Sequence, residues 1–277
     1  MLARLDHIQL MSEEPERLVA FYQEVMGMAA QFMDQDMWLC QGPERRLLIR
    51  RGKSKTCGFG AYRCETERDL AALRARLVEQ GIRLEPSPSP LFSGEAFSFF
   101  DPDGNQLVFG LSQQEPTQEA LTASLHGRLQ HLVFASDNAD ALVHFYTDVV
   151  GLLMSDKMVE GTAITACWMR AEDDKEHHSL AIFRKSEKGI DHHSYELRDW
   201  GLIRDWADHF ASKGIKLSWG PGRHGPGNNL FIFVYDPDGN WIELSSELEI
   251  IGGERPVGVW RNEPDTLNRW GAAVMRS

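Results

Sequence analysis

Hydrophobic and polar residues alternate in short runs along this chain, and two of these runs nearly repeat each other. Residues 231–244 read FIFVYDPDGNWIEL, and residues 99–110 read FFDPDGNQLVFG. In both, apolar residues lead into an Asp-Pro-Asp-Gly-Asn segment, whose proline fixes φ and whose glycine and asparagine tolerate positive φ. Apolar residues resume after the turn, as a second strand requires. Each run therefore predicts a β-hairpin.

Two further pairs of segments indicate a duplication. LDHIQL around His7 matches LQHLVF around His131, and LVAFYQEVMGM with Gly27 matches LVHFYTDVVGL with Gly151. Both pairs are offset by 124 residues (131 − 7 and 151 − 27), whereas the two turns are offset by 135 (236 − 101). The second copy therefore carries about eleven extra residues between helix and turn. Two copies are too few for a solenoid and predict a pair of modules.

The first copy begins with a predicted strand at residues 4–10, which a helix follows. Ser12 is a favoured N-cap residue, Pro15 suits the first turn, and Gly27 marks the end. The later part predicts two or three short strands between residues 30 and 51, a strand at 59–64, a helix at 66–80 and the first hairpin. The copy thus begins β-α-β and ends in strands.

The second copy repeats this order. Asp137 and Gly151 are suitable caps for its first helix. The predicted elements are a strand at 129–135, a helix at 139–150, strands near 152–157, 162–170 and 178–184, a strand at 192–197, a helix at 200–213 and the final hairpin.

These elements divide the chain into two modules, a linker and a tail. Residues 1–112 form the first module, the polar residues 113–127 the linker, and residues 128–247 the second module. The tail, residues 248–277, has no strong period. We expect it to cover a sheet edge, and closing over a pocket is the alternative.

Composition and charge narrow the class of protein. The 277 residues are 42% hydrophobic and 25% charged, which is typical of a soluble globular protein. No apolar run approaches the ~20 residues of a membrane span, and no signal-peptide pattern is present. Four cysteines without CxxC spacing indicate reduced thiols. The net charge of −12 argues against nucleic acid. We therefore expect a cytoplasmic protein with neither membrane nor nucleic acid as partner.

Three polar residues of the second copy lie on separate predicted strands: His131, His192 and Glu243. A lone carboxylate among aromatic and branched side chains is costly to bury unless a cation or hydrogen-bond donor meets it. Two imidazoles and one carboxylate bind one face of a divalent metal and leave other positions open, as in non-haem Fe(II) sites. Because a single buried histidine is more often structural, the prediction of a metal depends on all three residues together.

The first copy lacks two of these three residues. Its matching positions hold His7, Phe59 and Val108. We therefore expect a metal in the second module and none in the first, with His7 a structural residue without partners. The helix and linker histidines, His126, His144 and His209, are expected at the surface.

Four segments of the second copy carry a resemblance to a known family: KEHHSLAIF, EKGIDHHSYEL, GPGRHG and YDPDGNWIEL. To about Glu249, the chain resembles the two-module type I extradiol ring-cleaving dioxygenases of the vicinal oxygen chelate superfamily, of the catechol 2,3-dioxygenase kind. The resemblance implies an α+β fold of two tandem modules. Each module would be built of paired βαβββ units and would form a curled mixed sheet around a cavity, flanked by helices.

The resemblance also implies roles for individual residues. His131, His192 and Glu243 would bind Fe²⁺, with Mn²⁺ as the alternative metal. His178, fourteen residues before His192, would transfer protons, and His224 would lie beside the substrate.

Two pairs of adjacent histidines leave an assignment open. His193 is an alternative to His192 as a ligand, although aligning residues 194–195 with the family's Ser-Phe favours His192. His177 precedes His178, and strand alternation predicts that only one of the two points inward.

One position departs from the family pattern. The family usually has a tyrosine ten residues before its glutamate, where it donates a hydrogen bond to the substrate. This chain has Phe233 there, and Tyr235 lies two residues further on. We expect Phe233, Tyr235 and Trp168 to contact the substrate.

The resemblance favours an Fe(II)-dependent extradiol dioxygenase that opens the ring of a catechol-like diol with O₂, in the degradation of aromatic compounds. Its partners would be the diol, O₂ and further copies of the chain in a homo-oligomer. One alternative is another metal-dependent enzyme of the superfamily, such as an isomerase, thiol transferase or hydrolase, whose metal site often draws on both modules. The other is a non-catalytic protein that binds an aromatic ligand or confers resistance, which needs neither the ligand set nor His178.

Overall fold

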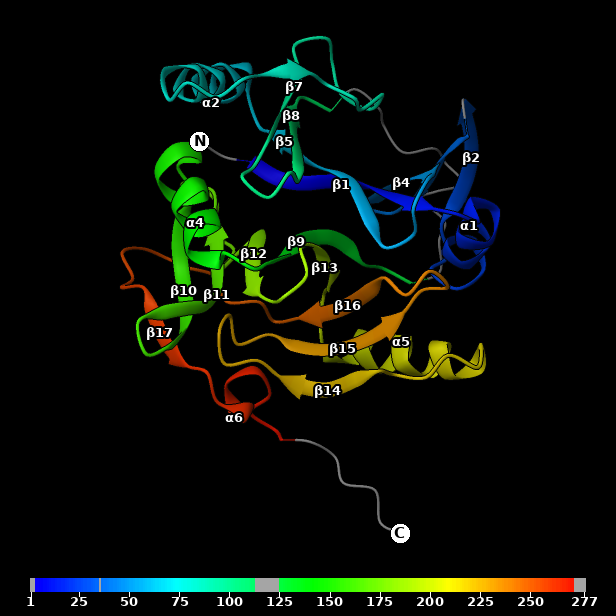
Figure 1. The fold of residues 1–277 in the computed structure, drawn as a ribbon. Coiled ribbons are helices and arrows are strands. Elements are labelled where there is room, and N and C mark those ends of the chain that lie inside the picture. The colour runs from blue at the N-terminus through cyan, green and yellow to red at the C-terminus, as the bar shows by residue number, and fades with distance from the viewer. Residues whose placement is uncertain (1–2, 35, 113–124, 272–277) are drawn as a thin grey trace.

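The fold is seen in a computed structural model that describes residues 3–34, 36–112 and 125–271. Within these ranges the chain forms an eight-stranded and a nine-stranded mixed sheet, one from each sequence repeat. Figure 1 shows the first module, in blue to cyan, packed against the second, in green to red. Residues 113–124 of the predicted linker and 272–277 of the predicted tail lie outside the described residues. Among those that are described, no helix combines the length and apolar character needed to span a membrane.

The first module consists of two βαβββ units side by side. The strand order is β2-β3-β4-β1-β5-β8-β7-β6, so the first strands of the two units, β1 and β5, meet at the centre. The first unit contains β1 (Ala3–Ser12), α1 (Pro15–Glu24), β2 (Ala29–Asp34), β3 (Met37–Gly42) and β4 (Arg45–Arg51). The second contains β5 (Thr56–Cys64), α2 (Glu67–Glu79), β6 (Glu85–Pro86), β7 (Phe97–Phe100) and β8 (Gln106–Gly110).

The second module repeats this plan with one added edge strand. Its order is β14-β15-β16-β13-β9-β12-β11-β10-β17, again with the two first strands, β9 and β13, at the centre. The first unit contains β9 (Arg128–Ser136), α4 (Ala139–His144), a π-helical turn η1 (Phe145–Val150), β10 (Leu153–Glu160), β11 (Ala163–Arg170) and β12 (Leu180–Arg184). The second contains β13 (Gly189–Leu197), α5 (Trp200–Ser212), β14 (Trp219–Arg223), β15 (Leu230–Tyr235) and β16 (Trp241–Ser246). The predicted paired βαβββ units are confirmed.

The tail supplies the added strand. β17 (Gly258–Arg261) pairs in parallel with β10 at the edge of the second sheet, and a short helix, α6 (Pro264–Leu267), follows it. This pairing covers the edge of the sheet, which is the role that we expected for the tail. The tail also reaches the cavity of the second module through Leu267.

Strand registers show that the two modules align residue for residue at their centres. In the second sheet, Ser194 of β13 lies opposite both His131 of β9 and Glu243 of β16. In the first sheet, Ala61 of β5 takes the place of Ser194. Its two partners there are His7 and Val108.

A pair of matching contacts joins the modules. The hydroxyl of Tyr22 on α1 donates to Oδ2 of Asp236 in the second-module turn, at 3.4 Å. The hydroxyl of Tyr146 on η1 donates to Oδ2 of Asp101 in the first-module turn, at 2.7 Å. Both tyrosines come from the repeated Phe-Tyr pair. Each helix therefore reaches the hairpin of the opposite module, and the duplicated sequence makes a pseudo-symmetric junction.

Two helix starts differ from the sequence prediction. The N-cap of α1 is Glu14, and the hydroxyl of Ser12 instead accepts from the Glu14 N–H at 3.1 Å. The N-cap of α4 is Asn138 rather than Asp137, with its side chain accepting from Ala141. Both regions offer several residues that suit an N-cap, so propensity alone does not select one.

The first-module counterpart of the predicted metal site is filled by apolar side chains. Phe59 and Val108 belong to a buried cluster there. His7 lies beside it, but the expectation that it has no partners is wrong. Its Nδ1 is 2.6 Å from Oδ1 of Asp6, and its Nε2 is 2.6 Å from Oγ of Ser89.

The other histidines differ in their surroundings. His126 and His144 each lie 2.6 Å from a carboxylate, and both side chains are substantially exposed. His209, expected at the surface, is half-buried instead, and its Nε2 donates to the carbonyl oxygen of Val25 at 2.8 Å. It therefore ties α5 to the end of α1.

Close packing between the modules gives a testable stability effect. A Cβ at Gly60 of β5 would lie 2.5 Å from Cδ2 of Leu132 on β9. Gly60→Ala should therefore lower the free energy of unfolding by ~1–3 kcal/mol, the usual cost of overpacking. Combining Gly60→Ala with Leu132→Ala removes this clash. The double variant should therefore lose less unfolding free energy than the two single variants lose together.

Urea denaturation measures these free energies. Gly94→Ala is the matched control, because no heavy atom lies within 4 Å of its added Cβ and its backbone does not require glycine. Additive losses in the double variant would contradict the packing of β5 against β9.

Candidate metal centre and active site

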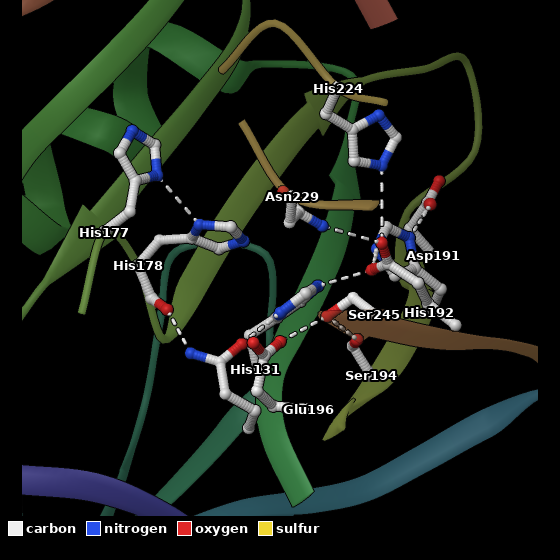
Figure 2. A network of polar contacts seen from close by, with 12 residues as sticks. His131, His177, His178, Asp191, His192, Ser194, Glu196, His224, Asn229 and Ser245 are labelled. Carbon is white, nitrogen blue, oxygen red and sulfur yellow. Dashed lines mark hydrogen bonds and ion pairs between the residues drawn. The ribbon is translucent and has the colours of Figure 1, made fainter. Parts of the chain in front are cut away.

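Three neighbouring strands bring His131, His192 and Glu243 together. The residues come from β9, β13 and β16, which are adjacent in the sheet. All three are buried, and one ligand atom of each lies within 4.8 Å of the others. The Nε2 of His131 is 2.9 Å, and that of His192 3.6 Å, from Oε2 of Glu243. Figure 2 shows His131 and His192 within the network of polar contacts around them.

Each imidazole is oriented by the residue directly before it. Nδ1 of His131 donates to Oε1 of Gln130 at 2.5 Å, and Nδ1 of His192 donates to Oδ1 of Asp191 at 2.6 Å. With Nδ1 donating in this way, Nε2 is the nitrogen of each ring that a metal would bind once it has no proton. Metal-binding histidines are typically held in this way, with the other nitrogen donating to an oxygen.

His193 does not join the cluster. Its side chain is fully buried on the opposite face of β13, and its Nε2 lies 3.3 Å from the hydroxyl of Tyr22. Adjacent residues of a strand point to opposite faces. The geometry therefore brings His192, not His193, to Glu243.

The electrostatics keep Glu243 ionised. Burial acts to raise its pKa, but the ring nitrogens of His131, His192 and His224, which lie close to the carboxylate, hold the pKa well below its usual value. Burial acts to lower the pKa of His192, yet Asp191 and Glu243 raise it to about 9. Burial lowers the pKa of His131 despite Glu243. A buried carboxylate with two imidazoles is a donor set that fits a divalent cation.

The sheet curls around a cavity of about 260 Å³ beside these residues. Trp168 and Phe233, which we expect to contact the substrate, line this cavity. Tyr235 does not, because it lies at the end of β15, is 53% exposed and stacks against Trp241 outside. The full lining is His131, Trp168, His178, Phe183, Lys185, Asp191, His192, Trp219, His224, Asn229, Phe233, Trp241, Glu243 and Leu267.

His224 and Asn229 meet the second oxygen of Glu243. Nε2 of His224 lies 3.3 Å from Oε1 of Glu243, and Nδ2 of Asn229 donates to the same oxygen at 3.2 Å. Nδ1 of His224 donates to the carbonyl oxygen of Leu267 at 2.5 Å. The tail therefore fixes the orientation of this histidine.

His178 also lines the cavity, with its ring centroid 4.4 Å from that of His131. Burial and the neighbours His131 and His177 lower its pKa well below the usual value, so its imidazole is neutral. Of these two adjacent histidines only His178 lines the cavity, and His177 is also buried rather than exposed. They precede β12, which starts at Leu180, so strand alternation does not apply to them.

Sequence reasoning missed several residues of the site. Gln130 and Asp191 had a signal, because each directly precedes a candidate ligand. Trp241 had one too, since it shares a strand face with Glu243 by alternation. The remaining missed residues had no signal in the sequence, because tertiary packing alone brings them to the cavity: Phe183, Lys185, Trp219, Asn229 and Leu267.

Comparisons with known proteins place the whole fold in a family. The family model of the Glyoxalase/Bleomycin resistance protein/Dioxygenase superfamily matches residues 4–109 and 128–244. Metapyrocatechase 2 of Cupriavidus necator is 28% identical over 246 residues, covering 80% of this chain and 74% of the relative.

Two solved structures share the fold. The Mn(II)-bound glyoxalase from Novosphingobium aromaticivorans has a TM-score of 0.80 at 25% identity, covering 98% of this chain and 92% of its own. Homoprotocatechuate 2,3-dioxygenase from Arthrobacter globiformis has a TM-score of 0.84 at 21% identity, covering 99% and 89%. With both modules matched, the chain belongs to the Glyoxalase/Bleomycin resistance protein/Dioxygenase superfamily.

Proposed function

We propose that this protein is an extradiol dioxygenase that uses Fe²⁺ and O₂ to open the aromatic ring of a catechol-like diol. The observation that carries the proposal is the convergence of His131, His192 and Glu243 on one side of an apolar cavity, with the neutral imidazole of His178 beside them. The relation to a metapyrocatechase over most of the chain supports the same reaction class.

Three residues would hold the metal. Nε2 of His131, Nε2 of His192 and a carboxylate oxygen of Glu243 form the two-histidine, one-carboxylate set that suits Fe²⁺ in oxygenases. Such a metal, when bound, lowers the pKa of the hydroxyls of a bound diol and leaves positions for both substrates. Mn²⁺ is the alternative, since a related fold is described as Mn(II)-bound.

His178 would take and return a proton. Its Nδ1 faces His177 at 2.9 Å, so its Nε2 is the nitrogen available to the cavity. A neutral imidazole accepts a proton from a diol hydroxyl, and the resulting imidazolium donates it back at a later stage. Burial keeps this imidazole neutral before the substrate arrives.

The cavity wall would bind the ring and exclude water. Trp168, Trp219 and Phe233 contribute aromatic faces, and Leu267 of the tail contributes an aliphatic one. Such a wall favours flat apolar groups, and the other side-chain donors beside it are paired, Lys185 with Asp191 and Asn229 with Glu243. An aromatic diol with an apolar substituent is therefore the substrate class we propose.

A glyoxalase-type isomerase is the second candidate, because one structural neighbour is described as a Mn(II)-bound glyoxalase. A protein that only binds an aromatic ligand is the third candidate, and it would need neither the three candidate ligands nor His178.

One pair of assays separates these candidates. The Fe²⁺-loaded chain should be assayed with catechols under O₂ and, separately, with the glutathione adduct of methylglyoxal. We expect a yellow ring-cleavage product in the first assay. Turnover of the glutathione adduct alone would favour the isomerase. If neither substrate is turned over, the result would favour a protein that only binds an aromatic ligand.

Metal content tests the ligand set. The wild-type chain, loaded anaerobically with Fe²⁺, should retain one iron per chain. Glu243→Gln should retain little, because the amide removes the negative charge from the cluster. Glu196→Gln is the control: its carboxyl is half-buried, burial raises its pKa to about 7, and it accepts from Ser245 rather than from the cluster. Iron retained by Glu243→Gln, or two irons per chain, would refute this assignment.

Removal of the imidazole at position 178 tests its role. His178→Phe should keep the iron and the KM for the diol but reduce kcat by ~10²-fold or more, the usual scale of acid–base catalysis. His144→Phe, on an exposed part of α4, should leave kcat unchanged. Loss of iron from His178→Phe would instead make this histidine a ligand.

A substitution of Phe233 tests the proposed substrate class. Its ring lies 5.3 Å, between centroids, from that of His192. Phe233→Tyr adds a donor to an apolar wall, so the ratio of kcat/KM for unsubstituted over bulky apolar catechols should rise, by a graded amount of ~1–3 kcal/mol at most. Tyr235→Phe, outside the cavity, should leave the ratio unchanged. An unchanged ratio in both variants would show that residue 233 does not face the substrate.

A further inference from the structure

Two buried residues, Asp156 and His177, form a line of contacts that leads to His178. Oδ2 of Asp156 on β10 is 3.2 Å from Nε2 of His177, and Nδ1 of His177 is 2.9 Å from Nδ1 of His178. The side chains of Asp156 and His177 are fully buried. Figure 2 shows the two histidine rings joined edge to edge, with His178 between His177 and the cluster around His131.

For a neutral His177, counting protons along this line assigns a tautomer to each histidine. An ionised carboxylate only accepts hydrogen bonds, so Nε2 of His177 must carry its proton toward Asp156. The Nδ1 of a neutral His177 then has no proton and accepts. The partner nitrogen, Nδ1 of His178, must therefore donate. A neutral His178 with its proton on Nδ1 has a lone pair on Nε2.

We propose that Asp156 and His177 are positioning residues that hold His178 in the Nδ1–H tautomer, with the lone pair of Nε2 directed to the cavity. The proposal rests on the proposed function, in which His178 takes a proton from the substrate. Without this line of residues, an imidazole interconverts between two tautomers, and only one of them accepts a proton at Nε2.

The tail holds Asp156 in place. Nε1 of Trp260 donates to Oδ2 of Asp156 at 2.7 Å, and Nη1 of Arg255 lies 2.9 Å from Oδ1. Burial acts to raise the pKa of Asp156, but His177, Arg255 and Trp260 hold it below the usual value. The carboxylate is therefore ionised, as the proton count requires.

Two glycines leave the space that this arrangement needs. A Cβ at Gly258, on β17, would lie 2.2 Å from Oδ1 of Asp156. A Cβ at Gly227, where φ is +74°, would lie 3.1 Å from Nδ1 of His177. The backbone N–H of His177 donates to the carbonyl oxygen of Glu249 at 2.9 Å. The end of the second module and the tail thus close around the Asp156–His177 pair.

A purely structural role makes a different prediction. If Asp156 and His177 only anchored the tail, replacing either residue would lower the free energy of unfolding and leave the tautomer of His178 unchanged. Nitrogen-15 NMR of the histidine-labelled full-length chain separates the two, because the shift of each ring nitrogen reports whether it carries a proton. The chain is measured without metal and after addition of Zn²⁺ as a diamagnetic probe, with the His178 signals assigned by their loss in His178→Phe.

We expect the proton of His178 on Nδ1 in the wild type. In Asp156→Asn, the amide can donate to Nε2 of His177, which then donates from Nδ1, so the proton of His178 should move to Nε2. His177→Phe removes the acceptor and should give a mixture of tautomers. Asp101→Asn, a buried carboxylate of the first module, is the matched control and should leave the His178 signals unchanged. A wild-type His178 with its proton on Nε2, or one tautomer in all variants, would overturn the proposal.

Kinetics provide the second readout. Asp156→Asn should lower kcat for ring cleavage by ~10²-fold, with KM and iron content unchanged. A loss of activity that follows lost iron would mean a structural role and would contradict the positioning role. If the wild type shows the expected tautomer but no ring cleavage, the proposed function fails while the assignment of the tautomer stands.

Discussion

The structure of the second module depends on how one buried carboxylate is neutralised. Glu243 is almost inaccessible to solvent on β16, where an unpaired charge would be costly. His131 and His192 meet one of its oxygens, and His224 and Asn229 meet the other. These partners come from β9, β13 and the segment between β14 and β15, so the central strands, the hairpin and the cavity wall must all be in register for Glu243 to be buried.

The first module shows what the same scaffold does without that charge. Val108 occupies the position of Glu243 and Phe59 that of His192, and both pack into an apolar cluster. His7 remains but bonds Asp6 and Ser89 instead. The Phe-Tyr pair of the first helix is kept in both copies, because each tyrosine bonds the turn of the opposite module. Duplication therefore preserved the junction and left the polar cluster in one copy.

The sequence predicted the features that depend on local pattern and on repetition. Alternation and the repeated turns predicted the paired βαβββ units, and the difference between the copies identified His131, His192 and Glu243. It did not predict that both His177 and His178 are buried, because they lie before β12 rather than on it. It predicted that the tail covers a sheet edge but not the contacts that the tail makes there: Trp260 and Arg255 contact Asp156, and Leu267 contacts His224.

We propose that a single divalent metal binds between the central strands of the second module. A crystal structure of the chain grown with Fe²⁺ under anaerobic conditions, with data collected on both sides of the iron absorption edge, tests it most directly. We expect one anomalous peak, within bonding distance of Nε2 of His131, Nε2 of His192 and a carboxylate oxygen of Glu243, and none beside His7. A peak bound by His193 or by His7, or no peak in an iron-loaded crystal, would contradict it.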